Sequence, residues 1–190
     1  MDRVEPIVDR PRISAAEFER MGECLDPCEL WDGVVLVHEP ATPYGDAVCL
    51  AIGGLLRAHV VPRSLGWVFG SSAGFQVGES PDRVLSPDVA FLRRERLPSL
   101  PRRGFYRLTP DLVVEVRSPS QTWAYTLERG GIWIASGAKV VWLVDPESRN
   151  ACVFRPTASP VEIGPEGVLS ADPAIEAFSI PMKDVFEGLD

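Results

Sequence analysis

The chain has 190 residues, 45% hydrophobic and 24% charged, a balance that excludes a disordered or collagen-like chain and predicts one domain over residues 1–190, with its core at 13–187. The formal net charge of −8 excludes a protein that coats nucleic acid with its whole surface, because phosphate binding requires clustered cations. No apolar run approaches the roughly 20 residues of a membrane span, and the start lacks the shape of a signal peptide, so we expect a cytoplasmic protein with no membrane partner. The four cysteines lack zinc-site spacing, and we expect them to be reduced thiols.

The first third of the chain predicts a short helix, a hairpin and a long helix. Ser14 and Glu17 have the spacing of a capping box, which predicts a helix that begins at Ser14 and ends near residue 22. Residues 29–38 contain a short run, the turn sequence Asp32-Gly33 and a β-branched run, which together indicate a hairpin. Apolar residues recur at helical spacing over residues 43–60 and predict the first long helix.

Strands dominate the remainder. Short strands are expected near residues 67–69, 74–77, 86–92, 140–144 and 152–154, and a central buried strand over residues 111–116. A helix is expected over about 122–136, and the tail is interpreted as loop and edge structure that ends in a turn of helix near 182–187. Helices that alternate with strands predict an α/β fold, with helices packed on a sheet.

Two acidic residues lie within or at the start of apolar strands. Glu115 interrupts the apolar run of residues 112–116, and Asp88 follows Pro87 at the start of another. A buried carboxylate is costly unless a metal, an arginine or several hydrogen-bond donors compensate it. Two carboxylates on adjacent strands suit Mg²⁺. The alternative is structural: Asp88 and Asp111 would be turn residues after prolines, and Glu115 a salt-bridge partner.

Three runs, taken together, resemble the Uma-two restriction-endonuclease family of the PD-(D/E)XK nuclease superfamily. They are residues 86–92, 109–120 and 137–146, and they contain Ser86-Pro87-Asp88 and the pair Asp111 and Glu115. The similarity extends from about Ser14 to Phe186 with similar spacings. It implies a restriction-endonuclease-like fold: a mixed central sheet flanked by helices, with the active site on two neighbouring strands.

The resemblance also implies roles for site residues. Asp88 matches the family's first metal-binding aspartate and Glu115 the acid of its (D/E)XK element, so these two would hold Mg²⁺ or Mn²⁺. Glu29 matches an early glutamate that approaches the same site. Asp111 matches the aspartate of a second Pro-Asp, whose role the pattern leaves open. In the implied chemistry Mg²⁺ polarises a phosphodiester and binds the attacking water.

The chain departs from the family pattern at the catalytic lysine. That lysine usually lies fourteen residues after the glutamate, where this chain has Arg129. Arginine neutralises phosphate charge but does not readily lose a proton, so the replacement is not conservative. Arg117, two residues after Glu115 and on the same side of the strand, is a second candidate for the role. Both arginines are alternatively counter-ions of the buried acids.

Positive charge is concentrated in residues 93–107, where six arginines and one glutamate give +5. We expect Arg93, Arg94, Arg102 and Arg103 to contact DNA phosphates; the alternative is a solvated connection.

The sequence therefore predicts a Mg²⁺- or Mn²⁺-dependent DNA endonuclease, impaired by the replacement of its lysine. The alternative is a catalytically inactive nuclease-fold interaction protein that forms a homodimer. His38 and His59 are interpreted as surface or capping residues, and Trp133 as a side chain packed toward the site.

Overall fold

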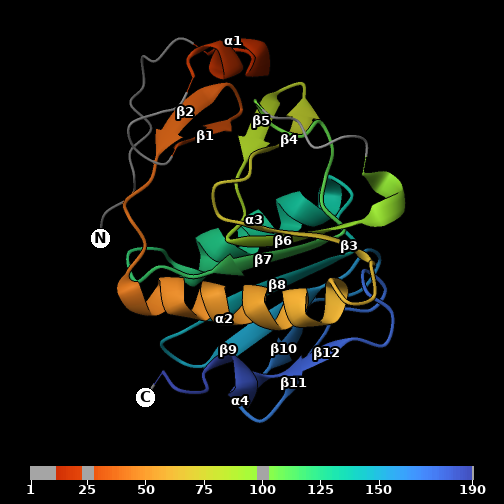
Figure 1. Cartoon of the computed structure of the whole chain (residues 1–190). Helices are drawn as coiled ribbons and strands as arrows, with labels where there is room; N and C mark the ends of the chain where they lie inside the picture. Colours follow the sequence, from red (N-terminus) through yellow and green to blue (C-terminus); the bar gives the residue numbers. More distant parts are fainter. Residues whose placement is uncertain (1–11, 23–27, 98–102, 190) are drawn as a thin grey trace.

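The computed structural model describes residues 12–22, 28–97 and 103–189 (Figure 1). In chain order its elements are α1 (Ala15–Arg20), β1 (Cys28–Trp31), β2 (Val34–Val37), α2 (Pro43–Val60), β3 (Gly66–Gly70), β4 (Phe75–Glu79), β5 (Asp82–Leu85), β6 (Val89–Arg93), the 3-10 helix η1 (Arg94–Arg96), β7 (Leu112–Val116), α3 (Trp123–Ala135), β8 (Val140–Asp145), β9 (Asn150–Phe154), β10 (Val161–Ile163), β11 (Val168–Ser170), β12 (Ser179–Pro181) and α4 (Met182–Val185).

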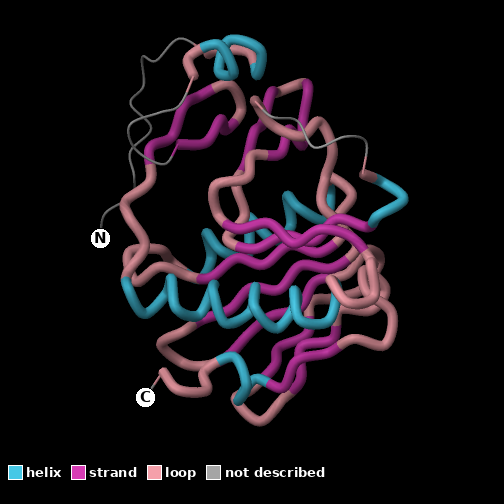
Figure 2. The backbone as a smooth tube through the Cα atoms, viewed as in Figure 1, coloured by secondary structure: helices cyan, strands magenta, loops and turns pink. Residues whose placement is uncertain are grey.

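A six-stranded sheet in the order β10-β9-β8-β7-β6-β3 forms the centre of the molecule. Strand β7 is parallel to β8 and antiparallel to β6, so the sheet is mixed. Helix α2 covers one face and α3 the other (Figures 1 and 2). This arrangement confirms the expected α/β fold, a mixed central sheet flanked by helices.

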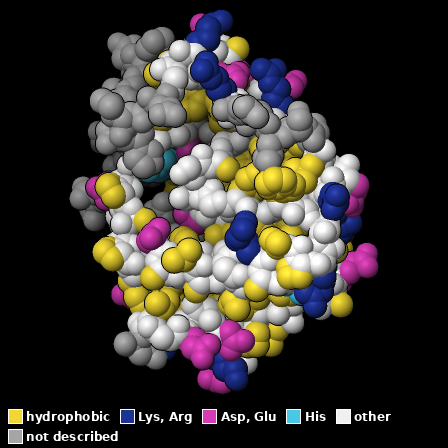
Figure 3. Space-filling view, viewed as in Figure 1, with side chains coloured by type: hydrophobic (Ala, Val, Ile, Leu, Met, Phe, Trp, Pro, Cys, Tyr) yellow, Lys and Arg dark blue, Asp and Glu magenta, His cyan; other side chains and the backbone are white. Residues whose placement is uncertain are grey.

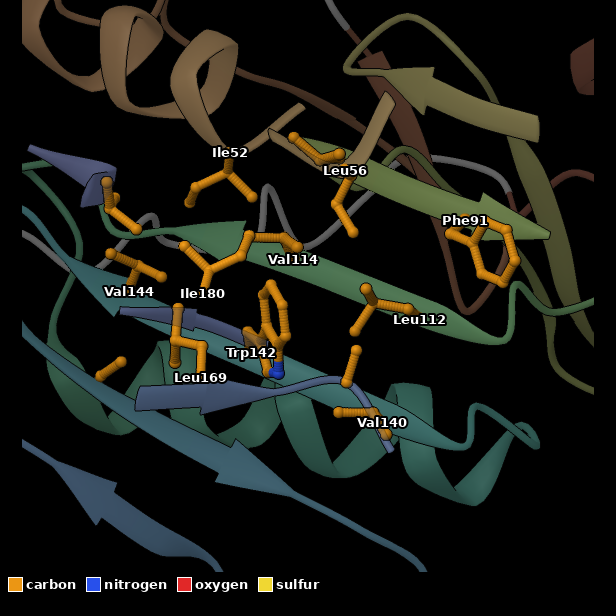
Figure 4. Close-up of a cluster of buried hydrophobic side chains, with 14 of the residues drawn as sticks. Ile52, Leu56, Phe91, Leu112, Val114, Val140, Trp142, Val144, Leu169 and Ile180 are labelled. Atoms are coloured by element: carbon orange, nitrogen blue, oxygen red, sulfur yellow. The ribbon is translucent and has the colours of Figure 1, made fainter. Parts of the chain in front are cut away.

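The alternation of side chains along the central strands explains the two helical layers. On β7, Leu112 and Val114 point into the core beneath α2, whereas Val113 packs on the opposite side with residues of α3. Figure 4 shows the first of these cores, where Ile52 and Leu56 of α2 lie over the sheet. The side chain of Glu115 alternates to the α3 side, and this position decides which residues it contacts.

A second, four-stranded sheet in the order β2-β1-β5-β4 stands beside the large one, with α1 packed on it (Figure 1). The β1–β2 hairpin turns at Asp32 and Gly33, both at positive φ, as the turn sequence predicted. The chain passes from β5 of the small sheet into β6 of the large sheet through residues 86–88. Asp88 therefore lies at the junction of the two sheets.

Most predicted elements are confirmed within one or two residues, including the capping box at Ser14 and Glu17. Strand β5 and the tail strands β10, β11 and β12 were not predicted individually, because the glycine and proline residues around them indicated only turns, loops and edge structure. The expectation of reduced thiols is wrong for Cys28, which is disulfide-bonded. Among the described residues, no helix combines the length and apolarity needed to cross a membrane.

Candidate active site

Asp88 directly precedes β6 and Glu115 lies on β7; the two strands are neighbours, as the sequence predicted, and they pair antiparallel. Val89 of β6 is paired with Val114 of β7, which places Asp88 beside Glu115 at one end of the ladder. The Val116 backbone N–H donates a 2.6 Å hydrogen bond to Asp88 Oδ2. Glu115 is only 7% exposed, and Asp88 is half-buried. The two carboxylates therefore share a site that water reaches only in part.

Glu29 brings a third carboxylate from the small sheet to this site. The side chain is buried and its Oε1 accepts a 2.6 Å hydrogen bond from the Ser86 backbone N–H, in the connection between the sheets. Its Oε2 lies 2.8 Å from His38 Nε2. We call Glu29, Asp88 and Glu115 the acid cluster.

Arg129 of α3 lies between two members of the acid cluster and is 5% exposed. Its Nη1 and Nη2 donate to Glu29 Oε2 and Oε1 at 2.8 and 3.1 Å. Its Nε and Nη2 donate to Glu115 Oε2 and Oε1 at 3.1 and 2.8 Å. The guanidinium thus forms a fork to both carboxylates, a geometry that a lysine cannot provide.

The electrostatics of the acid cluster leave Asp88 poorly compensated. Burial alone would raise the pKa of Glu29, but the charge of Arg129 and hydrogen bonds with His38 and Arg129 lower it to about 2. Burial and, after it, the negative charge of Glu115 together raise the pKa of Asp88 to about 7, and the hydrogen bond from the Val116 N–H offsets only part of their effect. Burial also raises the pKa of Glu115, despite Arg129 and the Trp133 indole. Among the described residues, no cationic side chain forms an ion pair with Asp88.

Two oxygens of the acid cluster have acceptor capacity for a metal ion. Within the described part of the chain, no group donates a hydrogen bond to Asp88 Oδ1, and Glu115 Oε2 accepts one bond, from Arg129. The described residues contain no group of three or more His, Cys, Asp or Glu side chains placed to hold a metal. Mg²⁺ is often bound by one or two carboxylates, with water and phosphate oxygens as its other ligands, so Asp88 and Glu115 fit it.

Arg117 does not join the acid cluster. Its Nε and Nη2 donate to Asp145 Oδ1 at 3.0 and 2.7 Å, and Nη2 also reaches Glu147 Oε2 at 2.9 Å. These bonds direct the guanidinium to the end of β8 and away from Glu115. The structure therefore places Arg117 as the counter-ion of other acids.

Asp111, whose role the sequence left open, lies at the opposite end of β7 from Glu115 and is 1% exposed. It accepts hydrogen bonds from the Arg93 backbone N–H at 2.9 Å and from Arg96 Nη1 at 2.7 Å. These contacts fix the start of η1 to the sheet. Asp111 is a structural residue in this position.

The predicted phosphate-binding arginines have different surroundings. Arg93 donates from Nε to the Ala174 carbonyl at 3.0 Å and from Nη2 to the Pro173 carbonyl, so its side chain attaches the tail to the sheet, which corrects its predicted use for DNA. Arg94 and Arg103 are exposed, and Arg102 lies outside the described residues. Strand β6 separates the start of this segment, at Arg93, from Asp88 by about 17 Å at 3.3–3.4 Å per residue.

Sequence reasoning underestimated two residues that contact the acid cluster. His38 was interpreted as a surface residue, although the hairpin register pairs Glu29 with Leu36, which makes His38 a diagonal neighbour of Glu29. Trp133 lies one turn after Arg129, and its Nε1 donates a 2.6 Å hydrogen bond to Glu115 Oε1. The helical spacing indicated the direction of Trp133, but not that its indole N–H would be a donor to the acid.

Comparison with known proteins agrees with this geometry. The family model Uma2, described as "Putative restriction endonuclease", matches residues 15–183. The chain belongs to the Uma2 family. Its fold is similar to a crystal structure from Anabaena variabilis ATCC 29413 titled "a putative nuclease belonging to DUF820", with a TM-score of 0.80, 19% sequence identity, and coverage of 92% of this chain and 97% of that chain. No curated protein matches the chain. The expected family and the expected fold are both confirmed.

Proposed function

We propose that this Uma2 protein is a cytoplasmic, metal-dependent DNA endonuclease that hydrolyses phosphodiester bonds. The observation that carries the proposal is the poorly compensated carboxylate of Asp88 beside Glu115. A half-buried and a buried acid, both with acceptor capacity and a raised pKa, form a site whose negative charge a divalent cation would stabilise.

Each residue of the cluster has a defined task in this proposal. Asp88 Oδ1 and Glu115 Oε2 would hold Mg²⁺ or Mn²⁺, and the bound ion would supply charge stabilisation at the phosphodiester and an activated water. Arg129 orients the Glu115 carboxylate through two hydrogen bonds, and Glu29 holds Arg129 in place through two more. Arg129 is in this account a positioning residue.

Access for a substrate is supported by the shape of the surface. Figure 3 shows a hollow between the part of the molecule that carries the small sheet and the part that carries α2, with one histidine and acidic side chains near its margin. Exposed Arg94 would contact the DNA backbone away from the scissile phosphate, because β6 separates it from Asp88. Arg103 is also exposed and would add a second contact to the DNA backbone.

A second candidate function is a nuclease-fold protein that binds a partner but does not cut. The contacts of Arg129 favour it: four hydrogen bonds to carboxylates occupy most of the five guanidinium N–H groups. Little of the guanidinium remains for a phosphate. The sequence also contains only two lysines, Lys139 and Lys183. Lys139 lies just before β8 and Lys183 lies in α4, so no lysine comes from the strands or helices that carry the acid cluster and Arg129.

Cleavage of supercoiled plasmid with Mg²⁺ or Mn²⁺ tests the proposal. The wild type should nick DNA, and Asp88→Asn and Glu115→Gln should abolish nicking. Glu128→Gln is the matched control, because Glu128 is an exposed acid on α3 beside Arg129, and it should nick like the wild type. Equal nicking by all variants, or nicking that persists in a chelator, would contradict the proposal. A folded wild type that binds Mn²⁺ without cutting would favour the second candidate.

A further inference from the structure

Strand β3 forms one edge of the large sheet. Among the strands that the structure describes, it pairs only with β6, in an unbroken antiparallel register from Gly66↔Arg93 to Gly70↔Val89. Four of the five residues of β6 are buried, whereas no residue of β3 is, and Trp67 is 47% exposed. One side of β3 is therefore partly open to solvent.

This edge lacks the features that protect sheet edges from pairing with another chain. Such edges are usually short, or carry charges, prolines or bulges. The opposite edge, β10, has three residues, Glu162 at its centre and Pro160 just before it. By contrast, β3 has five residues and carries no charge, no proline and no bulge.

The sequence of β3 suits pairing with a second copy of itself. It reads Gly66-Trp67-Val68-Phe69-Gly70, which is nearly symmetric about Val68. In an antiparallel pair centred on Val68, each Trp67 would lie opposite the partner's Phe69, and each glycine opposite a glycine. Aromatic cross-strand pairs of this kind stabilise antiparallel strands. The symmetric pairing brings no charged residue of β3 against another.

We propose that the chain forms a two-fold homodimer in which β3 pairs antiparallel with β3 of a second copy. The two large sheets then form one continuous twelve-stranded sheet, twice the six strands of a single chain. Trp67 and Phe69 lie on the same side of β3, because side chains alternate along a strand. The partner strand therefore covers the exposed Trp67. Because such a two-fold axis is perpendicular to the sheet, both acid clusters lie on the same face of the dimer.

The first test is the mass of the full-length protein by sedimentation velocity over a concentration series up to the high micromolar range. The wild type should be dimeric, and Trp67→Lys should be monomeric, because a lysine would face the partner's apolar Phe69. Leu50→Lys is the matched control, since Leu50 is 75% exposed on α2, outside the β3 edge, and it should remain dimeric. Far-UV circular dichroism confirms that each variant is folded.

A cysteine at the two-fold axis gives a second test that does not depend on a destabilising change. Residues directly opposite each other in an antiparallel pair have Cα atoms about 4.5–5.5 Å apart, which is within the range of a disulfide. Val68→Cys should therefore form a covalent dimer under mild oxidation, faster than Leu50→Cys. A monomeric wild type, a dimeric Trp67→Lys, or a dimer dissociated by Leu50→Lys would overturn the proposal. Faster cross-linking of Leu50→Cys than of Val68→Cys would also overturn it.

Discussion

Replacement of Asp88 by asparagine should stabilise the metal-free protein above neutral pH. The pKa of Asp88 is raised from 3.8 to about 7, chiefly by burial and then by the charge of Glu115. A carboxyl group whose pKa is higher in the folded state favours folding only when protonated. The wild type should therefore lose stability as the pH rises from about 4 to about 7, where Asp88 ionises in the folded protein. Asparagine keeps an acceptor for the Val116 N–H and has no charge to desolvate.

The magnitude follows from the pKa shift. A shift of about three pH units at 1.36 kcal/mol per unit sets a ceiling of about 4 kcal/mol. Because Asp88 is half-buried and water screens part of its charge, we expect about half of this, or about 2 kcal/mol, at pH 8. For a chain of this length that corresponds to a rise in Tm of about 4–8 °C.

Thermal unfolding of wild type and Asp88→Asn between pH 4 and pH 8 measures this effect, first in a chelator and then with Mn²⁺. In the chelator the difference should grow with pH and be small at pH 4. Saturating Mn²⁺ should reverse the order, because an ion at one hundred times its Kd stabilises a binding protein by about 2.7 kcal/mol and the variant has lost a ligand. An Asp88→Asn protein that is less stable than the wild type in the chelator at pH 8, or a difference independent of pH, would refute the reasoning.

Three other variants test the roles assigned to Arg129, Asp111 and the exposed arginines. Arg129→Lys should lower the free energy of unfolding by about 1–3 kcal/mol, because a point charge replaces the fork to Glu29 and Glu115; unchanged stability by denaturant unfolding would contradict the fork. Asp111→Ala should cost about 1–3 kcal/mol, because a buried backbone N–H loses its partner, with Mn²⁺ affinity unchanged by calorimetry; weaker Mn²⁺ binding would place Asp111 in the site. The double change of Arg94 and Arg103 to alanine should weaken DNA binding and lower the salt dependence by up to about 0.9 log units per lost phosphate contact, measured by fluorescence anisotropy. Unchanged affinity and slope would show that these arginines do not face DNA.

The sequence predicted the acids of the site better than their partners. Glu115 and Asp88 could be recognised because a carboxylate in an apolar strand is costly to bury, and their strands could be placed together by the resemblance. The bond between Arg129 and Glu29 joins residues one hundred positions apart, through the packing of a helix from one sheet layer against a hairpin from another. No local periodicity carries that information.

The partners of Arg93 and Arg117 could not be predicted from the sequence either. Charge counting grouped Arg93 with the exposed arginines that follow it, although its side chain donates to two carbonyls of the tail. Arg117 directly follows β7, two residues after Glu115, but its side chain donates to Asp145 at the end of β8 instead. Alternation along a strand gives the direction of a side chain and leaves its partners undetermined.

Calorimetric titration of Mn²⁺ into the purified wild type and Glu115→Gln is the measurement that tests the central claim, that the acid cluster holds a divalent cation. Glutamine keeps the size of the side chain and removes its charge. We expect saturable binding to the wild type and a loss of at least tenfold in affinity in the variant, which corresponds to about 1.4 kcal/mol. Equal Mn²⁺ binding by the two proteins, or no binding by the folded wild type, would contradict it.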